Sequence, residues 1–199
     1  MGDGTMLGPL VVFAVAMCFT PGPNVVMITA SAANFGFRRV IPQMLGITFG
    51  FGFMVLATGF GLAGVFQAEP RLHTLLKYAG AVYLLYLAWR IANANAGSSE
   101  AARAKPINFG EATLFTWMNP KAWVAAIGAQ AAFTTVGGNL VLESTVIASV
   151  LATACFASCV VWAAFGAAIA RFLGNRRART AFNWSMAGLL VISLIPVFW

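Results

Sequence analysis

The sequence predicts an all-α integral membrane protein with six transmembrane helices, arranged as two inverted three-helix repeats. Of its 199 residues, 60% are hydrophobic and 9% are charged, whereas about a quarter of the residues in a soluble domain are charged. The mean hydropathy is +0.84, and several apolar runs have the roughly 20 residues that cross the hydrocarbon as a helix. A polar segment at about 93–108 divides these runs three and three. An odd number of spans in each half makes the halves insert in opposite directions, which is the topology of an inverted repeat.

The first half of the chain, about 1–92, contains the first three expected spans, 7–33, 40–66 and 72–92. No lysine or arginine precedes the first run, which is also too long for the apolar part of a signal peptide. We therefore expect a membrane span there and not a cleaved signal. A glycine and two arginines follow the first run, and a proline precedes the third, so clear breaks separate the spans.

The second half, about 109–199, contains the runs 109–133, 140–170 and 181–199. Two glycines separate the first two of these runs, and an arginine-rich segment separates the last two. The run 140–170 is longer than the hydrocarbon is thick, so we expect one of its ends to lie in the interface. The run 181–199 has a marginal length for a span. With the linker at about 93–108, the two halves form a single transmembrane domain, 1–199.

Basic residues gather in the expected loops on one side of the membrane. Nine of the twelve lysines and arginines flank the first, third and fifth loops: Arg38, Arg39, Arg90, Arg103, Lys105, Arg171, Arg176, Arg177 and Arg179. Loops rich in these residues stay in the cytoplasm, so we expect both termini on the periplasmic side. Trp89, Trp184 and Trp199 near span ends suit an interfacial belt. The net charge of +7 thus orients the chain in the lipid bilayer, and nucleic acid is not expected as a partner.

Prolines interrupt the first and fourth spans near their middles. The segment CFTPGPN contains Pro21 and Pro23, and the segment LFTWMNPK contains Pro120; a shared Phe-Thr pair aligns the two segments. Proline removes a backbone donor and frees carbonyl groups inside a helix. In hydrocarbon, such groups persist only where protein or a water-filled cavity satisfies them. Interrupted spans at matching positions of two repeats indicate a substrate site near the membrane midplane. The alternative is a pair of packing kinks.

Lys121 lies beside the second break, and a charge near the bilayer centre is costly and normally has a partner in the bundle interior. The acidic residues Glu111 and Glu143 are expected near helix ends, away from it. We expect the missing counter-charge to be a substrate carboxylate; the alternatives are pairing with freed carbonyls and snorkelling to the interface. Because a lysine can release and regain a proton, Lys121 is also a candidate for ion coupling, with Glu111 and Glu143 as further candidates.

Five motifs occur together along the chain: PGPN at Pro21–Asn24, GFR at Gly36–Arg38, GITFG at Gly46–Gly50, YAGAVYLLYLAWR at Tyr78–Arg90 and NPK at Asn119–Lys121. The combination resembles the LysE/RhtB family of bacterial amino-acid exporters. The resemblance implies the inverted three-plus-three fold and efflux from the cytoplasm across the inner membrane, driven by an ion gradient. Members often carry an acidic residue where this chain has Phe51. The motifs GFR, YLAWRIA and AKPINF most resemble the cysteine and O-acetylserine exporter branch, which implies a small neutral substrate.

We therefore expect a secondary transporter, not an enzyme, that exports a small neutral amino acid or derivative and needs no cofactor. Lys121 and Asn119 would hold the substrate carboxylate, and Asn24 with the freed carbonyls would take its ammonium group. The expected substrate site comprises Pro21, Gly22, Pro23, Asn24, Asn119, Pro120 and Lys121. A proton or another ion is the expected coupling partner, and assembly as a homodimer is compatible with the sequence.

Two other functions stay open at the level of the sequence. A membrane thiol–disulfide relay would use Cys18, just before the first break, with Cys155 and Cys159 reaching it from the fifth span. We expect these cysteines to be small apolar packing residues, and no histidine joins Cys155 and Cys159 as a metal site. A passive channel is the second alternative, although a single buried lysine offers little selectivity.

Overall fold

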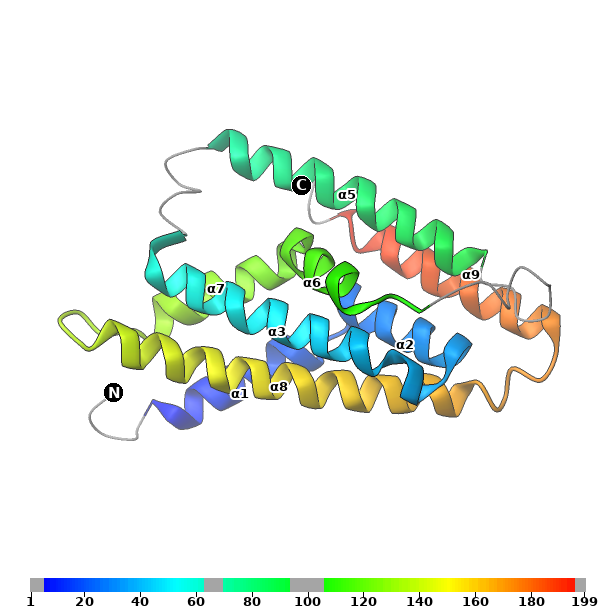
Figure 1. The fold of residues 1–199 in the computed structure, drawn as a ribbon, viewed down its shortest axis with the longest axis horizontal. Helices are drawn as coiled ribbons and strands as arrows, with labels where there is room; N and C mark the ends of the chain where they lie inside the picture. The colour runs from blue at the N-terminus through cyan, green and yellow to red at the C-terminus, as the bar shows by residue number, and fades with distance from the viewer. Residues whose placement is uncertain (1–5, 63–69, 94–105, 196–199) are drawn as a thin grey trace.

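The computed structural model describes residues 6–62, 70–93 and 106–195, and between 70 and 77 it describes the side chain of Thr74 alone. Throughout these ranges the regular structure is helical, with no strand, which confirms the all-α class. The elements in chain order are α1 (Leu7–Phe19), α2 (Pro23–Phe35), the short turn η1 (Phe37–Val40), α3 (Ile41–Ala57), the short turn η2 (Thr58–Leu62), α5 (Pro70–Ala92), α6 (Phe109–Met118), α7 (Pro120–Phe133), α8 (Leu140–Ile169) and α9 (Arg176–Ile192). They form one elongated bundle (Figure 1).

Two helical segments are long and apolar enough to cross a membrane by themselves. One is Phe37–Leu62, which joins η1, α3 and η2, and the other is Leu140–Ile169, which is α8. A third crosses if α1 and α2, which are bent by 55° at their junction, count as one broken span. These assignments rest on length and composition over the described residues. The structure therefore agrees with a membrane bundle, and the full set of six inverted spans stays a prediction.

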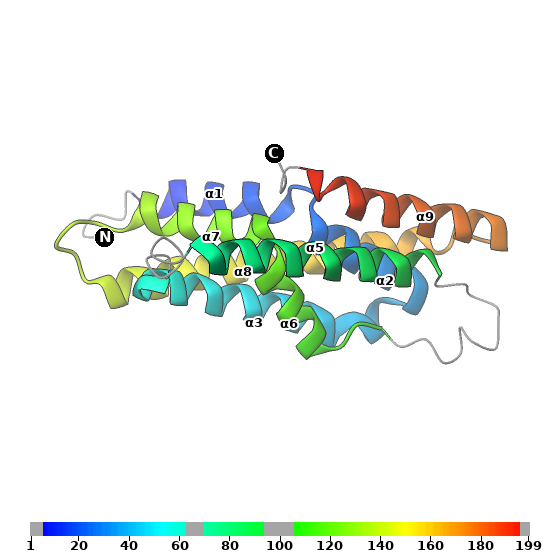
Figure 2. The same ribbon diagram turned by 90° about the horizontal axis from the view of Figure 1, so that it is seen from above.

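The first and fourth predicted spans are each divided into two helices. α1 ends at Phe19 and α2 begins at Pro23, while α6 ends at Met118 and α7 begins at Pro120. Both divisions fall at prolines, because proline lacks the N–H group that would continue the helix. Both junctions lie near the middle of the long axis of the bundle (Figures 1 and 2). The interruptions seen in the sequence are therefore real breaks in the backbone.

α3 packs against both α6 and α8, and two of its glycines allow a close approach to α6. A Cβ atom at Gly46 would lie 2.3 Å from the carbonyl oxygen of Phe109, and one at Gly50 would lie 3.2 Å from the Cα atom of Thr113. At this short separation, Thr113 Oγ1 donates to the Gly46 carbonyl over 3.1 Å. Trp117 Nε1 likewise donates to the Gly50 carbonyl over 3.0 Å. Small residues at such a contact are typical of helix packing in membranes.

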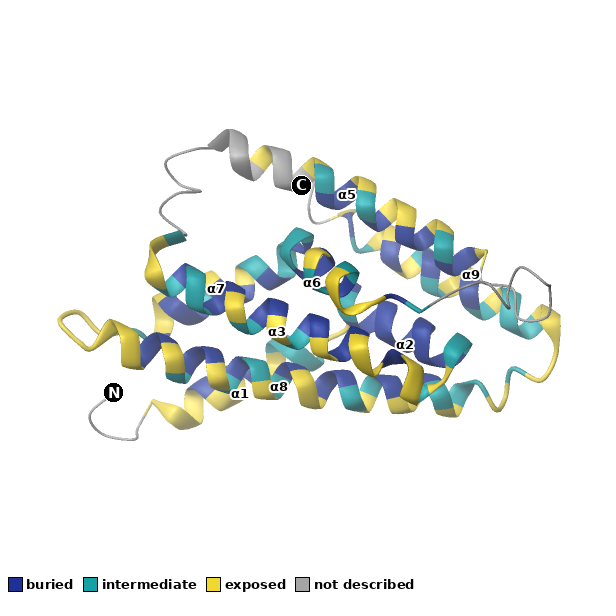
Figure 3. Cartoon of the chain, in the orientation of Figure 1, coloured by how far each residue is buried: buried dark blue, intermediate teal, exposed yellow. Residues whose placement is uncertain are grey.

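Large apolar side chains cover the outer faces of several helices. Exposed valine, leucine, isoleucine and tryptophan side chains occur along α1, α5 and α9 (Figure 3). The helices α2, α3 and α8 supply many of the buried side chains of the interior. An apolar exterior of this extent needs a cover. Lipid provides it for a protein whose helices have the length and composition of membrane spans.

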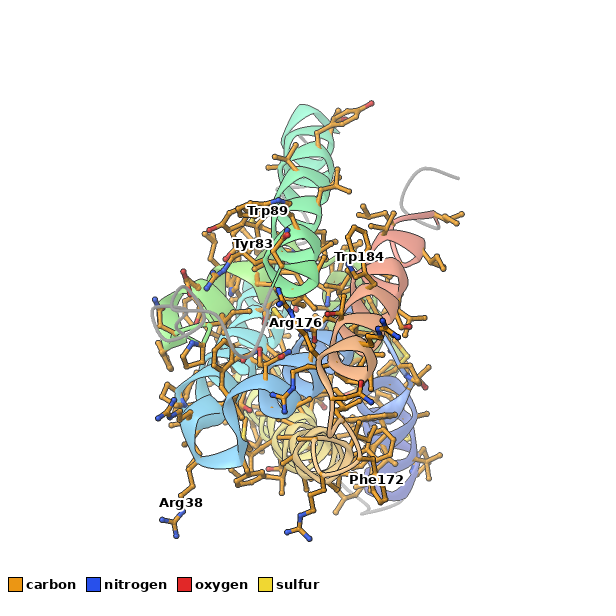
Figure 4. The ribbon with its side chains drawn as sticks, turned by 90° about the vertical axis from the view of Figure 1, so that its right-hand side faces the viewer. Arg38, Tyr83, Trp89, Phe172, Arg176 and Trp184 are labelled. Carbon is orange, nitrogen blue, oxygen red and sulfur yellow. The ribbon has the colours of Figure 1, made fainter. Side chains whose placement is uncertain are left out.

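The connections that carry arginines lie at one end of the bundle, which we call the basic end (residues 36–40 and 170–176). α2 joins α3 there and α8 joins α9, whereas the turn between α7 and α8 lies at the opposite end (Figures 1 and 2). Figure 4 looks onto the basic end, where Arg38 and Arg176 are labelled. The predicted loop residues Arg103 and Lys105, and the predicted belt residue Trp199, lie outside the described residues.

Candidate functional site

The junction between α1 and α2 consists of Thr20, Pro21 and Gly22. α1 ends here because Pro21 and Pro23 have no backbone N–H to donate, and the amide of Thr20 makes the last bond, 3.3 Å to the Ala16 carbonyl. Gly22 is fully extended, with φ −170° and ψ −177°. The helix restarts at Pro23, a residue that is favoured in a first turn. The carbonyl of Thr20 is thereby left outside the helical hydrogen-bond ladder.

Asn119 forms the junction between α6 and α7 and is only 3% exposed. Its amide donates to the Thr116 carbonyl over 3.2 Å, and its own carbonyl accepts from the amide of Ala122 over 3.0 Å. Its side-chain oxygen accepts from the amide of Lys121 over 3.1 Å, which is the usual role of asparagine at a helix N-terminus. Pro120 follows as the first residue of α7. Asn119 therefore both ends one helix and caps the next.

Lys121 connects the two junctions. Its Nζ atom donates to the Thr20 carbonyl oxygen over 2.6 Å, from the start of α7 to the end of α1. Gly22 leaves room for this side chain, because a Cβ atom there would lie 2.9 Å from Lys121 Cδ. Among the described residues the lysine has no carboxylate partner, and the ion pair that the structure records joins Arg90 and Glu111. The charge is thus held by a neutral backbone oxygen.

A cavity of about 50 Å³ lies where the two junctions meet. Residues from both junctions, from α3 and from α8 line it: Met17, Cys18, Thr20, Gly22, Pro23, Asn24, Val25, Ile47, Phe51, Asn119, Lys121, Ala122, Ala125, Cys155, Ser158 and Cys159. The side-chain oxygen of Asn24 is buried and has no hydrogen-bond partner among the described residues. Roughly three or four water molecules would fill this volume.

The structure brings five of the seven predicted site residues to this cavity. Gly22, Pro23, Asn24, Asn119 and Lys121 line it, whereas Pro21 and Pro120 do not. The two prolines interrupt the helices at the junctions, and residues next to them in the chain line the cavity. The predicted substrate site did not include the wall formed by α3 and α8, which comprises Ile47, Phe51, Cys155, Ser158 and Cys159. Cys155 and Cys159 were considered there only as partners of Cys18 in the alternative relay. Ile47 and Phe51 are four residues apart and therefore lie on the same face of α3. The sequence alone does not show that this face borders the cavity.

The three cysteines line the cavity together, and all are free thiols. Ser158 Oγ, one turn along α8 from Cys155, donates to the carbonyl of Cys18 over 2.8 Å. α1 is therefore tied to α8 at the level of the cavity. Cys155 and Cys159 are buried and form part of the core, as expected of packing residues.

The two glutamates proposed as coupling residues lie elsewhere. Glu111 accepts from the amide of Asn108 in a reciprocal cap at the start of α6, and Arg90 lies 3.4 Å from its carboxylate. Glu143, near the start of α8, accepts from the backbone amide of Thr135 over 2.9 Å and from its hydroxyl over 2.5 Å. Neither glutamate lines the cavity. Both carboxylates already have partners that stabilise helix ends.

Comparisons with known proteins show similarity along almost the whole chain. The family model LysE type translocator matches residues 15–195. A cysteine/O-acetylserine efflux protein of Salmonella typhimurium is 31% identical over 193 residues, covering 94% of each chain. The protein of the same description in Escherichia coli strain K12 is 29% identical over 201 residues, covering 98% of each chain. No solved structure matches.

Proposed function

Because the chain belongs to the LysE type translocator family, we propose that it exports a small neutral amino acid or amino-acid derivative from the cytoplasm across the bacterial inner membrane. Family membership places it among transporters and not among enzymes. Its relatives are described as efflux proteins for cysteine and O-acetylserine, and both compounds have small, uncharged side chains. We assign the same substrate class to this chain.

One contact carries the proposal: the hydrogen bond of 2.6 Å from Lys121 Nζ to the Thr20 carbonyl, which joins the two helix junctions. A neutral carbonyl leaves the positive charge uncompensated, and a substrate carboxylate is a stronger acceptor for it. When Lys121 Nζ donates to the substrate carboxylate instead, the Thr20 carbonyl is released and can accept from the substrate's ammonium group. Asn24 supplies a second, unpartnered acceptor at the same cavity. Asn119 positions Lys121 by capping its helix.

Alternating access would expose this cavity to each side of the membrane in turn. In the proposed arrangement, six spans form two inverted repeats that rock against each other about the two junctions. The basic end faces the cytoplasm, and both termini face the periplasm. Lys121 is the proposed coupling group, since it is the titratable side chain at the site whose protonation a substrate carboxylate would affect directly.

The lysine is tested by Lys121→Met, which keeps a long side chain and removes the charge. In inverted membrane vesicles, we expect cysteine export by this variant to fall at least about tenfold, the loss associated with one charge-assisted hydrogen bond. Val124→Met on the same helix is the matched control, because Val124 is 65% exposed and does not line the cavity. A Lys121→Met protein that inserts normally and exports at the wild-type rate contradicts the site assignment.

Substrate class and coupling are tested by a panel in the same vesicles: cysteine, O-acetylserine, threonine, leucine and lysine, each with and without a proton gradient. We expect cysteine and O-acetylserine to give the largest signals and an uncoupler to abolish accumulation. Lysine as the dominant substrate would overturn the assignment of a neutral substrate. Flux that follows only the substrate gradient and ignores the uncoupler would indicate a passive channel.

A further inference from the structure

Besides Asn24 in the cavity lining, three side chains contain buried polar atoms with no hydrogen-bond partner among the described residues: Gln43, Thr48 and Trp162. Gln43 on α3 is 0% exposed, and neither its amide nitrogen nor its amide oxygen is bonded; on α8, the indole nitrogen of Trp162 is buried and likewise unbonded. A dry protein interior penalises such groups, and buried polar atoms are therefore nearly always satisfied. Gln43 and Trp162 therefore lack the hydrogen-bond partners that buried polar atoms normally have.

Both side chains continue the walls of the cavity. Ile47 and Phe51 line the cavity from α3, and Gln43 precedes them by four and eight residues, so all three share one face of the helix. On α8, Ser158 lines the cavity, and Trp162 follows it by four residues on the same face. Each unpartnered group is thus one helical turn, about 5.4 Å, beyond a lining residue.

The two groups lie beyond the same end of the cavity. α3 and α8 pack against each other and run in opposite directions (Figures 1 and 2). A Cβ atom at Gly52 of α3 would lie 3.3 Å from the Cβ atom of Ala152 of α8, which fixes their relative level. Moving back along α3 to Gln43 and forward along α8 to Trp162 therefore leads in one direction. That direction is toward the basic end, where α3 begins and α8 ends.

We propose that Gln43 and Trp162 form a second binding station for the substrate, on the access path between the basic end and the cavity. The proposal rests on the proposed function, since the ligand is the same zwitterion. The amide nitrogen of Gln43 and the indole nitrogen of Trp162 are donors that fit a carboxylate, and the amide oxygen of Gln43 is an acceptor that fits an ammonium group. Water fills the station between passages.

A second buried glutamine, Gln130, and a second tryptophan, Trp117, have hydrogen-bond partners inside the bundle. Gln130 Nε2 donates to the Val55 carbonyl over 2.9 Å, and its side-chain oxygen accepts from Ser144 Oγ over 3.3 Å. Trp117 Nε1 donates to the Gly50 carbonyl over 3.0 Å. The chain thus contains matched controls: one glutamine and one tryptophan with internal partners, and one of each without.

The matched pairs separate a transport role from a structural one. Replacing an unpartnered buried amide by an apolar side chain of similar shape is neutral or stabilising, whereas removing a paired one is destabilising. We expect Gln43→Met to unfold at the same or a higher temperature than wild type and to export cysteine at least about fivefold more slowly. Gln130→Met should unfold at a lower temperature. Trp162→Phe should likewise keep or raise the unfolding temperature and slow cysteine export, whereas Trp117→Phe should lower the unfolding temperature. Gln43→Met export at the wild-type rate would overturn the proposal, as would a loss of stability matching that of Gln130→Met.

A labelling experiment decides the point without relying on transport. In inverted vesicles, a membrane-impermeant methanethiosulfonate reagent should modify Gln43→Cys above the wild-type background. O-acetylserine that contains no cysteine, which would itself react with the reagent, should slow the modification. Met44→Cys is the control, because Met44 adjoins Gln43 and is about as buried but lies off the helix face that Gln43 shares with Ile47 and Phe51; it should stay unmodified. Absence of labelling at Gln43→Cys overturns the path. Labelling without any export by the wild-type protein would instead reject the proposed function and leave the hydrated path established.

Discussion

At Gly22, the absence of a side chain decides where Lys121 lies. A Cβ atom there would lie 2.9 Å from Lys121 Cδ, and the flexible lysine, not the backbone, would give way. Gly22→Ala should therefore leave the unfolding temperature nearly unchanged, since the extended backbone suits any residue. Cysteine export should fall about tenfold, as expected when a charge-assisted hydrogen bond is lost.

Gly8→Ala on α1 is the control for this change, because a Cβ atom at Gly8 meets nothing within 4 Å. Export in vesicles and thermal unfolding in detergent would be measured for both variants. Equal export by Gly22→Ala and wild type would mean that the contact between Lys121 and Thr20 is not needed for transport.

Phe51 is the largest apolar side chain on the cavity wall and is 4% exposed. Shortening it in the series Phe51→Leu, Phe51→Val and Phe51→Ala should enlarge the space for a substrate side chain. We expect the ratio of leucine export to cysteine export to rise along the series, by about tenfold or more at alanine, since a few methylene groups in a pocket are worth that much discrimination.

The ratio is the right measurement because both rates come from the same vesicles, so losses of folded protein cancel. Phe49→Ala is the control, since Phe49 is 63% exposed two residues away on α3. A ratio that stays flat through the series, or that rises equally in Phe49→Ala, would remove Phe51 from the selection of substrate.

Sequence reasoning identified Lys121 but not its partner. An ammonium group in hydrocarbon requires a partner, and a scan for acidic side chains finds no candidate beside it. The acceptor is the backbone carbonyl of Thr20, and a backbone group has no sequence signal of its own. The prolines indicated that carbonyls are freed, which is the physical reason that this alternative was open. Which carbonyl it is depends on how two distant helices meet.

Among the elements, α2 and α9 are joined by a pair of amides. Asn34 Nδ2 donates to Asn183 Oδ1 over 2.8 Å, and Asn183 Nδ2 returns a bond of 3.3 Å to Asn34 Oδ1. Each single change, Asn34→Leu or Asn183→Leu, leaves one amide without this partner and should lower the free energy of unfolding by about 1 kcal/mol. The double variant should lose less than the sum.

Thermal or denaturant unfolding of the four proteins gives the coupling energy, which in membrane proteins averages about 0.6 kcal/mol. Ser185→Ala on α9, whose hydroxyl donates to the Ala181 carbonyl within the same helix, should show no coupling to Asn34→Leu. Additive losses in the double variant would mean that the amide pair does not hold α9 in place.

The helices could be predicted where the sequence contains a physical cause for their ends. Proline accounts for the starts of α2 and α7, and asparagine caps begin α6, α7, α8 and α9. The faces of these helices could not be predicted in the same way. Nearly every position of α3 or α8 is apolar, so no amphipathic stripe marks the side that borders the cavity. The cavity wall at Phe51 and Ser158 is decided by tertiary packing.

At the scale of the whole molecule, the arginines predict how the bundle is oriented. The connections between α2 and α3 and between α8 and α9 share the basic end (Figure 1), and positive loops stay in the cytoplasm. A phosphatase that is active only in the periplasm should therefore be inactive when fused after Gly174 and active when fused after Gly137. The reverse pattern would mean that the basic end faces the periplasm and would contradict the predicted orientation.

The inverted repeat is predicted from the sequence, but the lengths of the helices do not establish its six spans. Two segments cross by themselves and a third crosses as a broken pair, while α5 and α9 lie together on one side of the other helices (Figures 1 and 2). Phosphatase fusions placed in every connection between the helices would count the spans as well as orient them.

The hydrogen bond between Lys121 and a neutral carbonyl has an electrical consequence. An ammonium group without a carboxylate leaves one uncompensated elementary charge at the cavity, and a zwitterionic cargo does not change that total. Moving one elementary charge across the whole membrane potential is worth about 2.3 kcal/mol per 100 mV. Membrane voltage should therefore bias which side the carrier faces, even when the proton concentrations on the two sides are equal.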